Sequence, residues 1–279
     1  MKKKLFEAEV LSNEEIAPGI FRMSLLTEET AVSEAVPGQF VNLYPENGER
    51  LILPRPFGIC DANMTECTIE IVYEVVGRGT AKLSLAGRGH IIRTGVPLGR
   101  GFDLSGLKEL QIRDPRPFIL AGGGVGIAPL LFLARTLRSD DLKVLAVLGF
   151  RDTPFLIRDF EKTGCRVLVT TERLNEKTFL GTVIDCMTIN NISAPAYFAC
   201  GPRGMLKAVD SYVSEDCGDE FLQVSMEERM GCGYGVCVGC SIPVLERDES
   251  GEILRTRRKV CKDGPVFRGS EVIWDDGIR

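Results

Sequence analysis

The sequence predicts a multi-domain protein of the α/β plus β class, in which an antiparallel β-rich part precedes a parallel α/β part. From Lys4 to about Asp103, short β-rich runs are separated by proline and glycine, which is typical of an antiparallel barrel or sandwich. From about Pro117 to Val224, apolar runs alternate with helix-like segments, which indicates a parallel sheet with helices on its faces. After Glu227, glycine and cysteine dominate, and so short a part needs a staple to fold well. We therefore expect domains over residues 1–105, 106–225 and 226–279.

Individual elements follow from the apolar pattern within these parts. In the β-rich part, the clearest strands are expected at Gly38–Leu43 and Cys67–Val75. The α/β part should contain one apolar helix, Leu130–Leu137, which directly follows a glycine-rich turn. Its buried strands are expected at Phe118–Ala121, Val144–Leu148, Val167–Thr170 and Ala196–Cys200.

The composition excludes several classes of protein. With 44% hydrophobic residues, a chain of 279 residues can bury a sizeable core, so disorder is not expected. The formal net charge of -5 and the lack of a long basic run argue against nucleic-acid binding. Apolar stretches fall short of the roughly 20 residues that span a bilayer, and Glu7 and Glu9 interrupt the region where an export signal needs an apolar core. The chain is therefore expected to be cytoplasmic, with no membrane contact.

The cysteines indicate a metal centre. Ten cysteines in a chain without an export signal are expected to be thiols or metal ligands rather than disulfides. Three of them have C-x4-C-x2-C spacing, the plant-type 2Fe-2S signature, and the glycines between them let a loop wrap a compact cluster. Zinc is the competing metal, but zinc ribbons usually have two C-x2-C pairs and this tail has one. The predicted cluster ligands are Cys232, Cys237, Cys240 and Cys261.

The β-rich part carries two signals for a nucleotide. Arg55-Pro56-Phe57-Gly58 ends one expected strand, and Gly77-Arg78-Gly79-Thr80 follows another, just before a helix-like stretch. An arginine beside a glycine-lined helix start suits a pyrophosphate. Each signal alone is also compatible with an ordinary strand end or an ordinary turn.

The α/β part carries a third signal. The expected strand at Phe118 runs into Gly122-Gly123-Gly124-Val125-Gly126 and then a helix, which makes a phosphate cradle. Ile127 stands where a dinucleotide fingerprint has its third glycine, and Arg151 rather than an acid follows the next strand, so a standard Rossmann dehydrogenase is disfavoured. Cys200-Gly201-Pro202 closes a later strand, where the alternative is a plain strand-to-helix turn. No catalytic residue is predicted, because His90 is the only histidine and lacks a nucleophile partner.

Taken in order, RPFG, GRGT, AGGGVGIAPL and CGPRGM resemble the ferredoxin reductase-like flavoproteins over about residues 5 to 225. Adding EERMGCGYGVCVGC and VCKDGPVF, the chain resembles the electron-transfer subunits of NAD-linked dihydroorotate dehydrogenase over nearly its whole length. The resemblance implies an FAD-binding β-barrel, an NAD-binding α/β domain and a small 2Fe-2S domain. It implies FAD contacts at Arg55, Pro56, Phe57, Gly58, Val72, Tyr73, Glu74, Gly79 and Thr80, and NAD(H) contacts at Gly122, Gly123, Gly124, Gly126, Cys200, Gly201 and Pro202.

The implied function is electron transfer between NAD(H), FAD, a 2Fe-2S cluster and an FMN-containing dihydroorotate dehydrogenase catalytic subunit, in a heterotetramer of two of each chain that serves pyrimidine (UMP) biosynthesis. The orotate chemistry belongs to the partner, because this chain offers no convincing base or orotate pocket. One alternative is the small subunit of a ferredoxin-linked NAD(P)H or sulfide reductase. Another is a redox-inactive nucleotide- and zinc-binding regulatory module. The residues leave the choice between NAD and NADP open.

Two features depart from the family pattern. The family usually has serine or threonine where Gly58 stands, so a backbone N-H or water is expected to replace that hydroxyl at the flavin. The stretch between Cys240 and Cys261 is also longer than usual, and its polar part, Glu246 to Arg258, is expected to form an extended hairpin.

Overall fold

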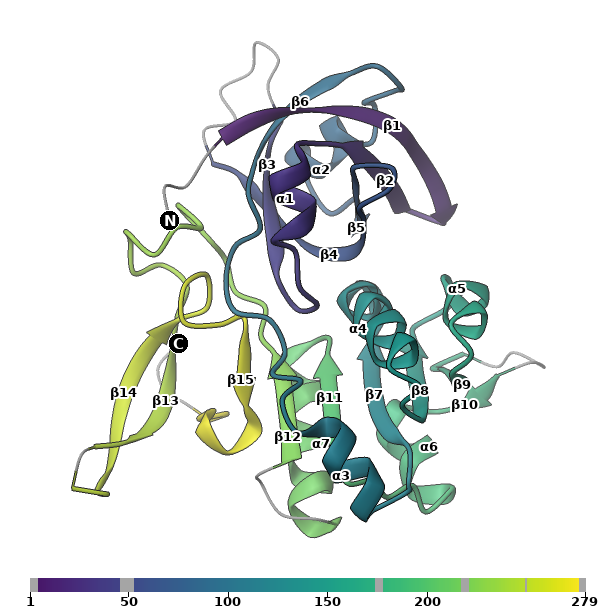
Figure 1. Ribbon diagram of the computed structural model, residues 1–279, viewed down its shortest axis with the longest axis vertical. Coiled ribbons are helices and arrows are strands. Elements are labelled where there is room, and N and C mark those ends of the chain that lie inside the picture. Colours follow the sequence, from purple (N-terminus) through teal and green to yellow (C-terminus); the bar gives the residue numbers. More distant parts are fainter. Residues whose placement is uncertain (1–4, 46–52, 174–177, 217–220, 249, 276–279) are drawn as a thin grey trace.

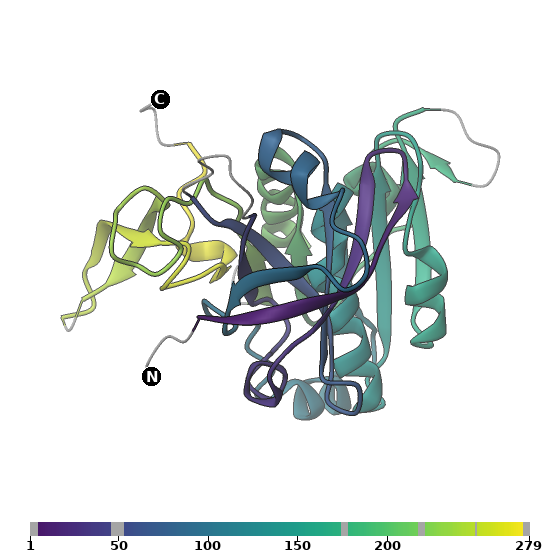
Figure 2. The same cartoon turned by 90° about the horizontal axis from the view of Figure 1, so that it is seen from above.

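The computed structural model describes residues 5–45, 53–173, 178–216, 221–248 and 250–275. A β-barrel lies above an α/β layer in Figure 1, and the C-terminal part lies beside both. Figure 2, seen from above, places that C-terminal part on one side of the molecule. Within the described residues, no helix combines the length and the apolar character needed to cross a membrane.

The N-terminal part is a closed antiparallel barrel with the strand order β1-β2-β5-β4-β3-β6, so the barrel rather than the sandwich is correct. Side chains alternate along each strand, and one set fills the barrel with a core that includes Val41, Leu43 and Ile71. Two short helices, α1 (Glu29–Ser33) and α2 (Arg78–Leu83), connect its strands. The strands are β1 (Leu5–Ala17), β2 (Ile20–Leu26), β3 (Phe40–Tyr44), β4 (Arg55–Asn63), β5 (Thr68–Glu74) and β6 (Ile91–Gly95).

The second part is a sheet with the order β10-β9-β8-β7-β11-β12-β15, parallel from β10 to β12. Both faces of β7 are buried: Phe118 and Leu120 pack on one side, and Ile119 and Ala121 on the other. The strands are β7 (Phe118–Gly123), β8 (Val144–Phe150), β9 (Arg166–Thr171), β10 (Phe179–Leu180), β11 (Tyr197–Cys200) and β12 (Leu222–Ser225). The expected parallel strands and apolar helix are confirmed.

Helices cover both faces of this sheet. On one face, α3 (Leu107–Arg113), α4 (Ile127–Ser139) and α5 (Ile157–Lys162) share a core with Phe118. On the other, α6 (Val183–Ile189) and α7 (Arg203–Asp216) share a core with Ile119. Two core clusters therefore sandwich the sheet, and α4 also reaches up to the barrel (Figure 1).

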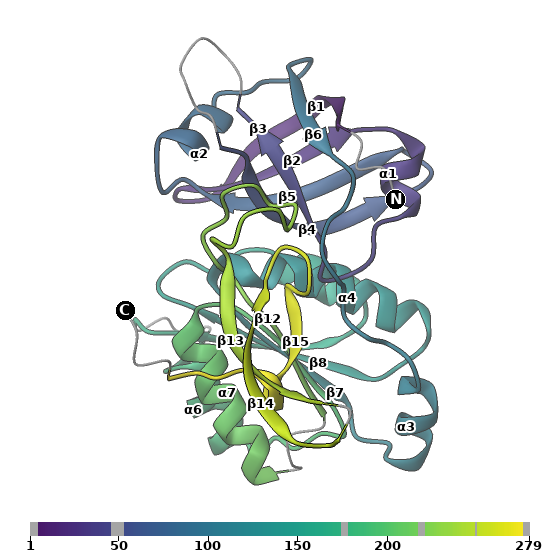
Figure 3. The same cartoon turned by 90° about the vertical axis from the view of Figure 1, so that its left-hand side faces the viewer.

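The C-terminal part is joined to the sheet by a strand of its own. After the cysteine-rich loop, which is residues 231–240, β13 (Ser241–Arg247) and β14 (Ile253–Lys259) form the expected extended hairpin, which Figure 3 shows in front of the sheet. β15 (Val266–Arg268) then pairs antiparallel with β12 and becomes the seventh strand. The short helix η3 (Gly269–Glu271) follows. The cysteine-rich loop contacts the barrel through a hydrogen bond between the hydroxyls of Tyr234 and Tyr44 of β3.

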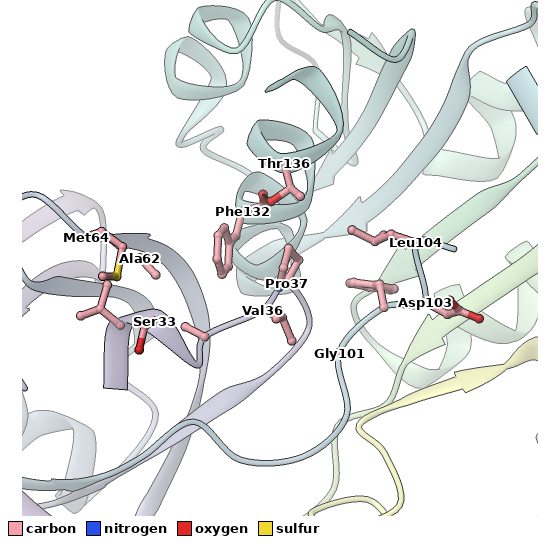
Figure 4. Close-up of a pocket in the computed structure, with 13 residues that line it drawn as sticks. Ser33, Val36, Pro37, Ala62, Met64, Gly101, Asp103, Leu104, Phe132 and Thr136 are labelled. Carbon is pink, nitrogen blue, oxygen red and sulfur yellow. Dashed lines mark hydrogen bonds between the residues drawn. The ribbon is translucent and has the colours of Figure 1, made fainter. Parts of the chain in front are cut away.

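Ion pairs connect the barrel to the α/β part. Arg135 of α4 lies 2.6 Å from Asp61 of β4, and Arg22 of β2 bridges Glu70 of β5 and Asp159 of α5 at 2.5 and 3.2 Å. A mainly apolar pocket opens at the same junction, beside α1 and the linker to α3 (Figure 4). None of the predicted site residues lines it, so the pocket plays no part in the sites described below.

Candidate cofactor-binding sites

The expected NAD-facing residues lie where two neighbouring strands end. β7 and β11 are adjacent and parallel, and Gly122 is paired with Cys200 at their carboxyl ends. The connection after β7 leads to β8 on one side, and the connection after β11 leads to β12 on the other, so the two connections run in opposite directions across the sheet. Such a point in a parallel sheet opens a ligand crevice. The glycine turn, including the short helix η1 (Gly124–Gly126), borders it and leads into α4.

The two turns approach each other so closely that side chains are excluded. A Cβ on Gly126 would lie 2.7 Å from the carbonyl oxygen of Cys200 and 2.7 Å from the Cα of Gly201. A Cβ on Gly123 would lie 2.6 Å from Sδ of Met205 in α7. The structure therefore brings the predicted glycine turn and the Cys200-Gly201 turn into direct contact, which only glycine allows at Gly126.

The Cys200 side chain is packed in the core on the α4 face of the sheet and is a neutral thiol. Burial raises the pKa of Cys200 to about 12, against a smaller opposing effect of its hydrogen bond with Ser225. The thiol therefore stays protonated at neutral pH, and it adds no negative charge beside the phosphates of a nucleotide.

On the barrel side, Arg55 lies directly against Gly79. A Cβ on Gly79 would fall 2.7 Å from Cζ of Arg55, so any side chain there would displace the guanidinium. The hydroxyl of Thr80 accepts hydrogen bonds from the N-H groups of Val76 and Gly77, at 3.0 and 3.2 Å, and so shapes the turn. Because α2 has only six residues, the guanidinium rather than the helix start is the main positive group for a phosphate.

The structure separates the three expected FAD contacts on β5. The ring of Tyr73 is buried in the barrel core beside Phe21 and Phe57, and its hydroxyl donates to Oδ1 of Asn13 at 2.9 Å. Val72 packs instead with the α4 core outside the barrel, and Glu74 is exposed. Strand alternation thus directs Val72 and Glu74 toward the domain junction and the Tyr73 side chain away from it.

The lack of a side chain at Gly58 is explained by Pro129, its neighbour in the α/β part. A Cβ on Gly58 would lie 2.5 Å from Cγ of Pro129, in the first turn of α4. The proline ring therefore occupies the space that the family's serine or threonine would need. The backbone of β4 and the proline of α4 make one tight contact between barrel and sheet.

Replacing Gly58 with serine is expected to lower the free energy of unfolding by about 1–3 kcal/mol, because the new side chain must displace Pro129. A Gly58→Ser, Pro129→Ala double variant should recover part of the loss, since the two sites share one contact. Urea unfolding measures both effects. Gly87→Ser is the matched control, because nothing lies within 4 Å of a Cβ at Gly87. Equal losses at the two glycines, or no recovery in the double variant, would contradict the explanation.

Backbone N-H groups in the cysteine-rich loop point at cysteine sulfurs. The N-H groups of Tyr234 and Cys237 donate to Sγ of Cys232, each at 3.4 Å, and the N-H of Gly235 donates to Sγ of Cys261 at 3.1 Å. Burial alone would raise the pKa of Cys232, but these backbone hydrogen bonds lower it to about 6. The loop therefore favours the thiolate form that metals bind.

The four predicted ligands are arranged as two pairs. Cys232 is hydrogen-bonded to Cys237, while burial and a hydrogen bond with Cys240 raise the pKa of Cys261 to about 12. Across the described residues, no three cysteine, histidine or acidic side chains converge on the position of a single metal ion. Two such pairs match two irons with two thiolates each.

Several residues at these sites escaped the sequence reasoning. Pro129 directly follows the glycine turn in the sequence, and nothing in the local pattern indicates its contact with Gly58. Burial, together with the carboxylates of Glu228 and Glu74, raises the pKa of Glu227 beside the domain junction. Asn42 of β3, which lies against the cysteine-rich loop, carried no signal in the sequence because it is one polar residue in an apolar strand.

Comparison with known proteins decides the family. Residues 227–273 match the family described as the iron-sulfur cluster binding domain of dihydroorotate dehydrogenase B. The dihydroorotate dehydrogenase B (NAD(+)) electron transfer subunit of Caldanaerobacter subterraneus subsp. tengcongensis is 35% identical over 96% of this chain and 98% of its own. That of Streptococcus thermophilus is 36% identical over 95% and 96%. The chain belongs to the dihydroorotate dehydrogenase B electron transfer subunit family.

Solved structures agree with this membership. An NADH-dependent reduced ferredoxin-NADP oxidoreductase, studied for flavin-based electron bifurcation, matches with a TM-score of 0.79 and 28% identity over 96% of this chain and 90% of that one. The ferredoxin reductase of carbazole 1,9a-dioxygenase shares the fold, with a TM-score of 0.67 at 16% identity over 80% and 69%. For this electron transfer subunit, the predicted fold, the oxidoreductase role and the cofactor set of FAD, NAD(H) and a 2Fe-2S cluster are confirmed at the level of the family.

Proposed function

We propose that this chain relays electrons between NAD(H) and an FMN-containing dihydroorotate dehydrogenase catalytic subunit, in the cytoplasm and in the pathway to UMP. The observation that carries the proposal is the arrangement of two glycine-lined nucleotide sites at one domain junction, with two cysteine pairs beside it. When bound, FAD accepts a hydride from NADH and releases electrons singly, and the cluster carries one electron at a time. The domains proposed for these roles are residues 1–105, 106–225 and 226–279.

At the nucleotide sites, the chain's groups bind and orient. Arg55, beside Gly79, is proposed to pair with the FAD pyrophosphate, and Pro56 and Gly58 to lie along the flavin. The Phe57 ring, packed beside Tyr73, supports this segment from the barrel core. Val72 and Glu74 face the same junction, whereas Tyr73 supports it from inside the barrel. The NAD phosphates are proposed to lie at the backbone of the two turns, with Gly122, Gly123, Gly124 and Gly126 on one side and Cys200, Gly201 and Pro202 on the other.

In the cysteine-rich loop, the proposed ligand pairs are Cys232 with Cys237 and Cys240 with Cys261. The chain holds each pair through its backbone, because N-H groups already donate to the sulfurs of Cys232 and Cys261. Hydrogen bonds of this kind orient thiolate ligands and offset their negative charge. The zinc-binding alternative is disfavoured by the cysteine spacing, which has only one C-x2-C pair.

The partner is proposed to dock on the tip of the cysteine-rich loop. Val236 and Val238 flank Cys237 and are 85% and 71% exposed. Two exposed aliphatic side chains next to a ligand offer a small apolar contact, and a partner that covers them also shortens the path for electrons. The single histidine, His90, gives this chain no evident base for orotate chemistry. That step is assigned to the FMN-containing subunit, in a heterotetramer of two of each chain.

Visible absorption and metal content of anaerobically purified protein test the cofactor set. We expect flavin bands and about two irons per chain, with both chromophores bleached by NADH. Zinc without flavin would refute the proposal and favour a regulatory module. Rapid transfer to ferredoxin, but none to a dihydroorotate dehydrogenase catalytic subunit, would instead favour the ferredoxin-linked reductase.

A Val236→Asp, Val238→Asp variant then tests the partner. It should keep the flavin and iron spectra and lose electron transfer to the catalytic subunit, because charge replaces the apolar contact. Leu85→Asp is the matched control, since Leu85 is 84% exposed and follows α2 of the barrel part of the chain. Transfer unaffected by the double substitution would place the docking surface elsewhere.

A further inference from the structure

Asn42 of β3 is a buried polar side chain without a partner. Its exposed fraction is 0%, and neither Nδ2 nor Oδ1 has a hydrogen-bond partner among the described residues. Leaving such a group unpaired costs about 1–3 kcal/mol, so orphaned amides are rare in folded proteins. A position that retains one needs an explanation.

The strand pattern directs Asn42 out of the barrel and toward the cysteine-rich loop. Val41 and Leu43 fill the barrel core, so Asn42, the residue between them, faces outward. There the Asn42 carboxamide meets Gly233, between the ligands Cys232 and Cys237, and a Cβ on Gly233 would lie 3.0 Å from Oδ1 of Asn42. Gly233 has φ of +70°, a second reason why that position admits only glycine.

The neighbours of Asn42 fix its location further. Tyr44, next along the same outward row of β3, shares a hydrogen bond of 2.9 Å between its hydroxyl and that of Tyr234 in the cysteine-rich loop. On the other side, Asn42 is the register partner of Pro56 in the Arg55-Pro56-Phe57-Gly58 segment of β4. Asn42 therefore lies between the segment proposed for FAD and the loop proposed for the cluster.

We propose that Asn42 is a positioning residue for the iron-sulfur cluster, and that its carboxamide N-H donates a hydrogen bond to a cluster sulfur. This inference rests on the function proposed above. It accounts for the unpartnered amide, for its place beside Gly233 and for an amide in an otherwise apolar strand. A donor at sulfur stabilises the reduced cluster, which carries more negative charge, and so raises its reduction potential.

If Asn42 had a purely structural role, its replacement would leave the reduction potential of the cluster unchanged. Replacing an unpaired buried amide by an apolar group of similar shape is expected to be neutral or stabilising for the fold. Asn42→Leu should therefore leave the free energy of unfolding unchanged or higher while lowering the cluster potential. We expect the reduction equilibrium of the cluster to shift about tenfold, which is about 59 mV for a one-electron couple.

The experiment is a redox titration of the purified chain, followed by the electron paramagnetic resonance signal of the reduced cluster, with the flavin potential as an internal reference. Asn42→Ala removes the amide without adding bulk beside Gly233, so it serves if the leucine variant loses the cluster. Tyr44→Phe is the control, because it breaks a hydrogen bond at the same interface without touching the amide. Its shift should be clearly smaller than that of either Asn42 variant.

The outcomes distinguish an error in the role of Asn42 from an error in the proposed electron-transfer function. A cluster potential unchanged in both Asn42→Leu and Asn42→Ala overturns the role of Asn42 and leaves the electron-transfer function standing. An equal shift in Tyr44→Phe also overturns it, because the effect would then belong to the packing of the interface. Wild-type protein without flavin or iron refutes the proposed function itself, before any variant is compared.

Discussion

Replacing Gly126 with alanine is expected to weaken the binding of NADH about tenfold or more. The new Cβ would lie 2.7 Å from the carbonyl oxygen of Cys200 and 2.7 Å from backbone atoms of Gly201. Because backbone cannot swing aside, the glycine turn after β7 and the turn after β11 must move apart. Overpacking of this kind costs about 1–3 kcal/mol, and 1.4 kcal/mol is about tenfold in affinity.

The dependence of flavin reduction on NADH concentration measures this effect, and the flavin spectrum reports whether FAD is retained. Gly204→Ala in α7 is the matched control, since nothing lies within 4 Å of a Cβ there and the same turn is nearby. If both variants bound NADH like the wild type, the crevice between β7 and β11 would not be the nucleotide site.

Replacing Cys261 with alanine is expected to abolish the iron-sulfur cluster and leave NADH-driven reduction of the flavin intact. Cys261 is 2% exposed and pairs with Cys240, so its loss leaves one iron with a single thiolate and no side chain nearby to replace the other. Iron content should fall from about two per chain to nearly none. Electron transfer to the catalytic subunit should fall with it.

Cys67→Ser is the control for Cys261→Ala, because Cys67 lies in the barrel and is partly exposed. It should keep the iron, the flavin and the transfer rate. A Cys261→Ala protein that retained two irons would exclude this residue as a ligand. Loss of flavin together with iron would mean that the cysteine-rich loop also supports the barrel. Flavin binding and cluster binding would then not be independent of each other.

Local patterns predicted much of the fold. The apolar runs at Phe118 and Val144 are buried on both faces, which is what a parallel strand requires, and their positions agree with β7 and β8. The glycines between the cysteines predicted a closely wrapped loop with backbone N-H groups turned toward sulfur, and N-H groups of that loop do donate to Sγ of Cys232. Each of these features depends on residues that are close together in the chain.

Features that depend on distant residues could not be predicted. The fit of Gly58 against Pro129 needs the barrel and α4 in place, and the sequence suggested only a missing hydroxyl. The burial of the Tyr73 side chain inside the barrel depends on which residues of β5 face the barrel core and which face outward. The contact of Asn42 with Gly233 joins residues that are far apart in the chain, so no local pattern could predict it.

The pairing of β15 with β12 also bears on how this protein avoids aggregation. Without residues 266–268, β12 would end the sheet and present a row of unpaired N-H and C=O groups, a template for another chain. In the folded protein the segment that follows the last cysteine ligand covers that row. The C-terminal part therefore also covers the edge of the sheet. Removing it would leave that edge free to pair with another chain.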